Sequence, residues 1–221
     1  MKKFALIVAG GVGSRMGAEI PKQFLEIAHK PILMWTLERF LAFDSHMELI
    51  LVLPENQLAT WAQLCDRFQF KPSIKLAKGG NTRFQSVKNG LNEIQEDGIV
   101  FIHDGVRPLV SLQTLQNCFE IAVEKGNALP VSPVVESIRK VEGEVSKHVD
   151  RNHFRLVQTP QTFQIRLVKE AYQQPEQELF TDDASVCEAM GIAIHLVNGN
   201  PENIKITNPA DLLIAESLLN Q

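Results

Sequence analysis

The sequence predicts an α/β fold in which a mostly parallel, twisted sheet carries helices on both faces. Short runs of β-branched and aliphatic residues alternate with longer amphipathic segments over most of the chain. This alternation is typical of sheets whose strands are buried on both sides by helices. The 221 residues contain no internal repeat, low-complexity tract or linker, so we expect one domain that spans residues 1–221 and buries a full core.

The individual elements follow from the same pattern. Strands are predicted at Phe4–Val8, Leu49–Leu53, Ile99–Ile102, Ala128–Val131 and Ile194–Val197. Helices are predicted at Ile32–Phe43, Gln57–Phe68, Thr82–Gln95, Leu112–Glu124, Arg166–Ala171, Asp183–Met190 and Ala210–Leu219. In sheets of this kind a ligand binds at the carboxyl ends of the strands, so the loops that follow the strands are the candidate site.

One stretch, residues 133–149, departs from this rhythm. It reads PVVESIRKVEGEVSKHV, which predicts two polar strands joined by a hairpin turn at Glu142-Gly143. A two-stranded ribbon is only marginally stable alone in water, so we expect it to pack against something else. Residues 133–151 are therefore expected to form a projecting β-hairpin arm at a dimer interface. A ribbon that lies over its own domain is the alternative.

The composition argues against several classes of protein. A formal net charge of −4 disfavours nonspecific binding of nucleic acid. No apolar run reaches membrane-spanning length, and the N-terminal MKK leads into a strand without a signal-peptide cleavage site. Cys65, Cys118 and Cys187 lie far apart without metal-ligand spacing, as expected for reduced core thiols. We therefore expect a cytoplasmic protein without a membrane or nucleic-acid partner.

The first predicted strand ends in a glycine-rich loop that carries an arginine. Residues 8–17 read VAGGVGSRMG, and glycines let backbone N–H groups approach an anion closely. The dinucleotide fingerprint fails because Met16 stands at its third glycine, which disfavours a dehydrogenase, and the Gly-Lys-Ser/Thr ending of a Walker loop is absent. Instead Arg15 lies inside the loop and Lys22 closes it, which suits a polyphosphate. A glycine-rich turn with solvated cations is the alternative.

A carboxylate follows the strand Ile99–Ile102, in the segment HDGVRP. At the carboxyl end of a central strand a carboxylate can share a hard cation with phosphate oxygens, so Asp104 is the best magnesium ligand in the chain. A turn-stabilising aspartate is the alternative. His103 has the chemistry of a ligand or base, but a lone histidine at a strand end is more often a hydrogen-bonded structural residue.

Two further segments carry candidate polar groups. Residues 78–83, KGGNTR, place two glycines and an N-cap candidate before a helix, where backbone groups can bind a base edge or a phosphate; an ordinary loop and cap is the alternative. Residues 203–209, NIKITNP, predict a short strand in which Lys205 projects opposite its isoleucine neighbours, into the site or to solvent. Asn208 is expected to cap, and Pro209 to start, the last helix.

Several of these segments together resemble one family. VAGGVGSRMG with IPKQFLEI, HDGVRP, VDRN followed by QTPQTF, TDDAS and ENIKIT occur in the order found in the 2-C-methyl-D-erythritol 4-phosphate cytidylyltransferases. The resemblance runs from Phe4 to the last helix. It implies a Rossmann-like nucleotidyltransferase fold, transfer of CMP from CTP to methylerythritol phosphate in non-mevalonate isoprenoid synthesis, and a homodimer whose β-arm reaches the partner's site.

The resemblance also implies roles for individual residues. CTP would be bound by Ala9, Gly10, Gly11, Gly13, Gly80, Asn81, Arg83 and Ser86. The catalytic cations would be Arg15, Lys22 and Lys205, and Asp104 would hold Mg²⁺. Arg107, Thr159 and Thr181 would bind the polyol phosphate, with Ser137 of the arm keeping a hydroxyl role and Arg151 reaching in from the partner's arm. The chain departs from the family at Ala9-Gly10-Gly11, where two alanines are common, at Glu136-Ser137, where Asp-Thr is usual, and at Glu202, which replaces an aspartate.

These residue types suit attack of a phosphate on the α-phosphorus of CTP. The second pKa of a phosphate monoester is about 6, so the nucleophile is ionised at neutral pH and needs no general base. Two unit charges about 4 Å apart repel by about 4 kcal/mol at an effective dielectric constant near 20, which cations must offset. A ribitol-5-phosphate cytidylyltransferase is the nearest alternative. A catalytically silent nucleotide-binding homologue is another, although the full cation set argues against it.

Overall fold

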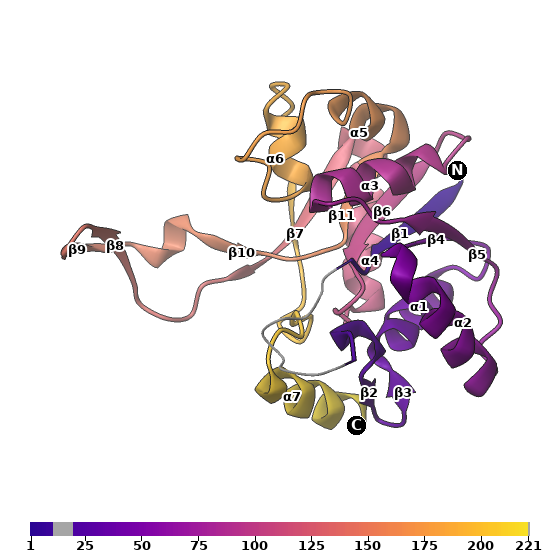
Figure 1. The fold of residues 1–221 in the computed structure, drawn as a ribbon. Coiled ribbons are helices and arrows are strands. Elements are labelled where there is room, and N and C mark those ends of the chain that lie inside the picture. The colour runs from indigo at the N-terminus through magenta and orange to yellow at the C-terminus, as the bar shows by residue number, and fades with distance from the viewer. Residues whose placement is uncertain (11–19, 221) are drawn as a thin grey trace.

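The computed structural model describes residues 1–10 and 20–220 of the chain, and its core is a twisted sheet (Figure 1). Within the described residues the sheet has eight strands, in the order β10-β7-β11-β6-β1-β4-β5, with β12 also paired to β7. The bounds are β1 Lys3–Val8, β4 Glu48–Leu53, β5 Ile74–Lys78, β6 Ile99–Asp104, β7 Asn127–Pro133, β10 Arg155–Val157, β11 Gln161–Gln164 and β12 Leu196–Asn198.

The sheet is parallel at its centre and antiparallel where the chain returns from the arm. β1 pairs in parallel with both β4 and β6, and β4 pairs in parallel with β5. β11 runs antiparallel between β6 and β7. The register sets Val8 of β1 beside Asp104 of β6, so the carboxyl ends of these two strands meet. The glycine-rich loop and the HDGVRP segment therefore begin side by side.

Helices cover both faces of the sheet, as predicted. α1 (Ile32–Phe43), α2 (Leu58–Arg67) and α4 (Leu112–Lys125) pack against one face, where Ala5 and Ile7 point. α3 (Arg83–Asn92), α5 (Ile165–Ala171) and α6 (Asp183–Glu188) pack against the other, where Phe4 and Leu6 point. Successive strand residues alternate between faces, so an apolar run supplies two cores. No helix in the described ranges has the length and apolarity to cross a bilayer.

A third, smaller cluster holds the C-terminal helix. α7 (Pro209–Leu219) packs with Ile27, Val106 and Ile206 beside the short hairpin of β2 (Glu26–Ile27) and β3 (Lys30–Pro31). As predicted, the Asn208 side chain caps α7 by accepting the Asp211 N–H, and Pro209 is its first residue. The helix thus anchors the segment that carries Lys205.

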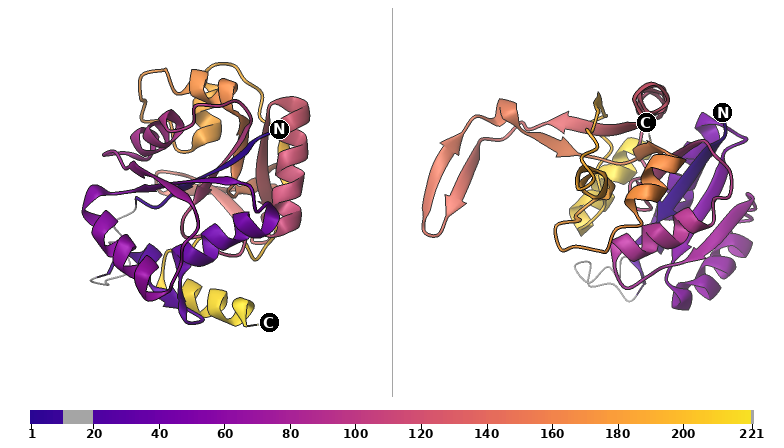
Figure 2. Two further views of the ribbon diagram at one scale, coloured as in Figure 1. Left: turned by 90° about the vertical axis from the view of Figure 1, so that its right-hand side faces the viewer. Right: turned by 90° about the horizontal axis from the view of Figure 1, so that it is seen from above.

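The polar stretch forms a hairpin that projects from the body of the molecule (Figure 2, right). β8 (Ile138–Glu142) pairs antiparallel with β9 (Val145–Val149), and Gly143 in the turn has a φ of +60°. Val141 and Val145 are each 68% exposed. The alternative of a ribbon over its own domain is therefore wrong for this chain. The strands β7 and β10 form the base of the arm.

Some elements differ from the sequence prediction. β5, β10 and β11 were not predicted, because polar residues interrupt the apolar pattern of β5 and β11 and β10 has only three residues. Lys205 does not lie in a strand: residues 203–207 are irregular, and Ile206 donates a backbone hydrogen bond of 3.0 Å to Val106. Burial nevertheless alternates there, with Ile206 buried and Lys205 exposed. The lysine is thus directed by tertiary contacts of this segment rather than by a strand ladder.

Candidate active site

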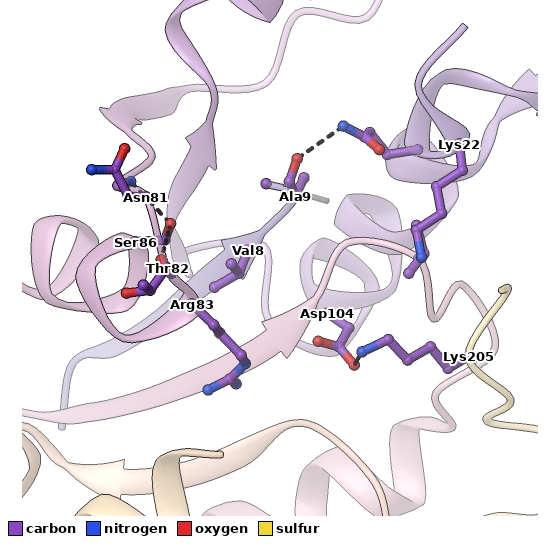
Figure 3. A pocket seen from close by; sticks show the side chains of 13 residues that line it. Val8, Ala9, Lys22, Asn81, Thr82, Arg83, Ser86, Asp104 and Lys205 are labelled. Atoms are coloured by element: carbon purple, nitrogen blue, oxygen red, sulfur yellow. Dashed lines mark hydrogen bonds and ion pairs between the residues drawn. The ribbon is translucent and has the colours of Figure 1, made fainter. Parts of the chain in front are cut away.

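A cavity of about 260 Å³ opens where β1 and β6 end (Figure 3). It brings together these residues predicted from the sequence: Ala9, Gly10, Lys22, Gly80, Asn81, Arg83, Ser86, Asp104 and Lys205. Val8, Gln23, Thr82 and Val106 complete its lining. Gly11, Gly13 and Arg15 lie outside the described residues. The cavity therefore joins four segments that the sequence singled out separately: the glycine-rich loop, KGGNTR, HDGVRP and NIKITNP.

Asp104 is the acidic centre of this cavity. Its Oδ2 atom lies 3.1 Å from Nζ of Lys205 and 3.1 Å from Nε of Arg107, and Figure 3 shows Asp104 and Lys205 directed at each other. Burial disfavours the charged carboxyl, but the cations of Lys205, Arg107 and Arg83 outweigh it and hold the pKa of Asp104 well below its ordinary value. Asp104 is therefore a carboxylate throughout the neutral range.

The loop before α3 is shaped by local hydrogen bonds. Thr82 caps the helix by accepting the Gln85 N–H at 3.1 Å, as the sequence predicted. A Cβ atom at Gly80 would lie 2.3 Å from Cβ of Gln85, so only glycine fits. The N–H groups of Gly80 and Asn81 donate to Ser86 Oγ and Gln85 Oε1. These two donors, which we expected to face a ligand, are used within the loop.

The end of β1 is tied to the segment that carries Lys22. Gln23 is buried, and its Nε2 atom donates to the carbonyl of Ala9 at 2.9 Å and to Oε1 of Gln57 at 2.6 Å. Lys22 opens the 3₁₀ turn Lys22–Phe24 directly after Pro21 and lines the cavity. Gln23 thus ties the segment that carries Lys22 to the end of β1. No role was assigned to it from the sequence, although it lies within the segment IPKQFLEI.

Arg83 is held by a buried carboxylate on the opposite side of the cavity. Its NH1 and NH2 atoms donate to the two oxygens of Asp183 at 2.8 and 2.6 Å, and the Tyr172 hydroxyl donates to Asp183 Oδ1 at 2.6 Å. Burial opposes the charge of Arg83, but the Asp183 carboxylate raises the pKa of the guanidinium above its ordinary value. Bidentate pairing of this kind fixes the direction of the guanidinium.

Asp183 and Tyr172 were not identified from the sequence. Asp183 is the first residue of α6 and is fully buried, and Tyr172 stacks on Phe84 with ring centroids 4.7 Å apart. The segment TDDAS marked a helix start, which fits Asp182, the N-cap residue. Nothing in the spacing indicated that the second aspartate turns inward to meet an arginine a hundred residues earlier.

The predicted substrate residues fall into two groups. Arg107 and the buried Thr159 lie directly beside Asp104, because Arg107 binds its carboxylate and the Thr159 hydroxyl accepts its N–H at 3.1 Å. Thr181 is exposed just before α6. Ser137 and Arg151 are exposed on the arm, and the Arg151 guanidinium donates to the Val135 carbonyl. Within the described chain, none of these five residues lines the cavity itself.

Comparison with known proteins gives one family. The family model described as IspD, 2-C-methyl-D-erythritol 4-phosphate cytidylyltransferase, matches residues 4–221. A relative of that name from Phocaeicola vulgatus is 53% identical, with 99% of this chain and 100% of the relative covered. A relative of that name from Halalkalibacterium halodurans is 39% identical, with 99% and 97% covered.

Solved structures agree with this result. The crystal structure of 2-C-methyl-D-erythritol 4-phosphate cytidylyltransferase from Thermus thermophilus superposes with a TM-score of 0.79 at 32% identity, over 100% of both chains. A 4-diphosphocytidyl-2C-methyl-D-erythritol synthase from Anaerococcus prevotii superposes with a TM-score of 0.85 at 24% identity, over 100% of this chain and 96% of the other, which supports the fold alone. The chain belongs to the 2-C-methyl-D-erythritol 4-phosphate cytidylyltransferase family.

Proposed function

We propose that this chain transfers CMP from CTP to 2-C-methyl-D-erythritol 4-phosphate, with release of pyrophosphate, in the cavity at the ends of β1 and β6. Family membership over residues 4–221 supports the activity. The observation that carries the choice of site is the Asp104–Lys205 ion pair, flanked by Arg107, beside a glycine-rich loop. A ribitol phosphate acceptor is not favoured, since the family model and the full-length relatives carry the methylerythritol name.

The cations of the cavity suit a reaction between two anions. Lys22, Arg83 and Lys205 line it and Arg107 adjoins it, although the whole chain carries a formal charge of −4. We assign Lys22 and Lys205 to the reacting phosphates of CTP, together with Arg15. Lys22 and Lys205, which already line the cavity, would then meet charge on the transition state. Losing one such donor typically costs roughly 100- to 1000-fold in rate.

The proposed reaction uses no general base. His103 directly precedes Asp104 in β6, and burial lowers the pKa of its imidazole to about 4. Both of its ring nitrogens are occupied, by the Arg107 carbonyl and the Thr159 hydroxyl. A methylerythritol phosphate that is already ionised at neutral pH requires no proton transfer before attack. The site therefore supplies positive charge and orientation rather than proton chemistry.

Magnesium is the divalent ion that the donor set fits. Lys205 and Arg107 both bind Oδ2 of Asp104, which leaves the second carboxylate oxygen outside these two ion pairs. No cluster of three or more His, Cys, Asp or Glu side chains occurs in the described part of the chain. A single carboxylate is the arrangement in which Mg²⁺ takes its remaining ligands from water and substrate phosphates. Asp104 would hold the ion, which would neutralise triphosphate charge.

We further propose that the enzyme is a homodimer in which each arm completes the site of the other copy. The arm stands away from the body (Figure 1). Most of its side chains are exposed within a single chain. Ser137 and Arg151 supply a hydroxyl and a guanidinium, which suit the polyol and its phosphate. CTP is bound by residues at the end of β1 and at the start of α3: Ala9, Gly10, Gly80, Asn81 and Ser86. The polyol phosphate is bound by Arg107, Thr159 and Thr181.

The test is magnesium-dependent release of pyrophosphate from CTP by the purified protein. Methylerythritol 4-phosphate and ribitol 5-phosphate are offered in parallel, and release is expected with the first alone. Release with ribitol 5-phosphate alone would keep the chemistry and replace the acceptor. CTP binding without release in either reaction would instead support a silent nucleotide-binding protein. Light scattering at the assay concentration tests the dimer, which a fully active monomer would contradict.

A further inference from the structure

The HDGVRP segment contains a buried histidine for which the proposed reaction has no direct use. His103 is fully buried at the end of β6, and its ring meets Phe40 edge-on with centroids 5.0 Å apart. Its Nε2 atom lies 3.0 Å from the Arg107 carbonyl oxygen, and its Nδ1 atom lies 2.9 Å from Oγ1 of Thr159. The imidazole thus connects the end of the turn to the segment that leads into β11.

The partners of the ring determine where its hydrogen lies. A carbonyl oxygen only accepts, so the Nε2 atom of a neutral imidazole carries the hydrogen and Nδ1 is the acceptor. The Thr159 hydroxyl therefore donates its only hydrogen to Nδ1. Its oxygen accepts the Asp104 N–H at 3.1 Å. The hydroxyl of Thr159 consequently has no further hydrogen to donate.

Thr159 is in turn connected to both members of the Asp104–Lys205 ion pair. Its hydroxyl oxygen holds the backbone of Asp104, and its carbonyl accepts a hydrogen bond of 2.8 Å from Nδ2 of Asn203. Asn203 is fully buried and precedes Lys205 by two residues. Arg107 completes this network of hydrogen bonds, since it donates to the Asn203 carbonyl at 2.8 Å and to Asp104 at 3.1 Å.

We propose that His103 is a positioning residue: by holding the Thr159 hydroxyl in one orientation, it fixes Asp104 and Lys205 relative to each other at the cavity floor. The kinetic consequence of this inference rests on the proposed function, whereas the hydrogen-bond arrangement does not. Groups that orient a metal ligand from behind typically contribute roughly 10- to 100-fold to metal affinity or activity. The imidazole acts through Thr159 and touches no substrate.

Two substitutions test the two hydrogen bonds of the His103 imidazole separately. His103→Asn places an amide oxygen near the former Nδ1, where it accepts from Thr159, and loses the bond to the Arg107 carbonyl. His103→Gln places an amide nitrogen near the former Nε2, where it donates to Arg107, and loses the acceptor for Thr159. We expect the Gln variant to lose roughly 10- to 100-fold in kcat and to need more Mg²⁺ for half-maximal rate, with KM for CTP unchanged.

The Asn variant is expected to keep most of the wild-type kcat, which a role in packing alone would not produce. His46→Gln, at a side chain that is 94% exposed, is the matched control. Adding Thr159→Val to the Gln variant should reduce kcat little further, because residues that act through one another are not additive. Equal losses in the Asn and Gln variants, or fully additive losses in the double variant, would overturn the proposal.

Two readouts cover the cases in which the histidine variants or the assay fail. If the histidine variants do not fold, two variants of Thr159 replace them. Thr159→Ser retains the hydroxyl and should keep most of the wild-type kcat. Thr159→Val removes the hydroxyl and should lower kcat and raise the Mg²⁺ concentration needed for half-maximal rate. The ¹⁵N spectrum of the wild-type imidazoles at neutral pH is expected to show His103 protonated at Nε2. Protonation at Nδ1 would overturn the inference whether or not CTP is turned over, while absent turnover alone would count against the proposed function.

Discussion

The floor of the cavity, formed by Asp104, Lys205 and Arg107, and the β-arm both carry residues assigned to the proposed reaction, yet they are built in opposite ways. Asp104 is bound by Lys205, Arg107 and, through its N–H, Thr159, all within one chain. Arg151 lies on an exposed ribbon and binds a single backbone carbonyl of the same ribbon. The floor is therefore organised by contacts within one chain, whereas in the proposed dimer the arm would gain its position relative to a site from the second copy.

This difference follows from where the chain can bury polar groups. A buried charge is tolerated only when it is paired and hydrogen-bonded, and a sheet with helices on both faces supplies partners from several segments. A two-stranded ribbon offers each side chain one neighbour and much solvent. Substitutions in the floor should therefore affect both stability and rate, and substitutions in the arm should affect binding alone.

The largest effect is expected at the buried pair on the cavity wall. Asp183→Ala leaves the Arg83 guanidinium without its bidentate partner and should lower the free energy of unfolding by about 3 to 5 kcal/mol. Urea denaturation at neutral pH measures it. Glu142→Ala breaks the exposed Lys140–Glu142 pair on the arm, whose atoms lie 2.6 Å apart, and should leave the midpoint nearly unchanged. Equal losses of unfolding free energy in the two variants would contradict the difference between the cavity and the arm.

The next largest effect concerns the rate. Asp104→Asn keeps the shape of the side chain but removes the charge that holds Lys205 and Arg107. We expect kcat to fall roughly 100- to 1000-fold, without recovery at high Mg²⁺. Steady-state kinetics over a range of Mg²⁺ concentrations measure this loss. A variant that regains full rate at high Mg²⁺ would show that Asp104 contributes only affinity for the ion.

The buried imidazole predicts a pH dependence of stability. Burial lowers the pKa of folded His103 from 6.5 to about 4, so between these values the unfolded chain binds the extra proton. The free energy of unfolding is therefore highest, as far as His103 is concerned, above pH 6.5. It falls by about 3 kcal/mol in total as the pH is lowered toward 4. The difference in unfolding free energy between wild type and His103→Asn should shrink over this range. A constant difference would contradict the lowered pKa.

The smallest effect is expected on the arm. Arg151→Ala should raise KM for methylerythritol phosphate about 10- to 100-fold, as expected for one charge-assisted hydrogen bond, and leave KM for CTP unchanged. Lys147→Ala, at another exposed arm residue, is the control. Mixing the Arg151→Ala and Lys205→Ala proteins should restore activity if arms cross between copies, because one heterodimer site is then intact. Absence of any recovery would contradict exchange of the arms.

Much of the fold was predictable because its signals are local. Apolar runs mark β1, β4 and β6, and Thr82, Asn208 and Pro209 mark helix starts, the first two through bonds to residues three positions away. The strand β11 was not predicted, since QTFQ reads as polar. Gln161 is nevertheless fully buried, because its amide binds Asp182 and the Ala184 N–H. A polar strand becomes a core strand only through partners distant in sequence.

The candidate site shows the same division. The loops that meet in the cavity were predicted, because glycines and charged residues after strands are visible in sequence. The direction of each side chain was not predictable: Arg83 is turned to Asp183, and the N–H groups of Gly80 and Asn81 are turned to neighbouring side chains. Motifs therefore predicted which residues gather, and tertiary hydrogen bonds determine which of their atoms face the cavity.

The insertion of β11 between β6 and β7 has a consequence for how the chain folds during synthesis. β6 and β7 are both complete by Pro133, but they are joined only when residues 161–164 pair with each of them. Until the ribosome has released this segment, β6 presents an unpaired, largely apolar edge, the kind of surface that promotes intermolecular pairing. The nascent arm emerges during this interval, so a chain stalled within it is the form most prone to aggregate.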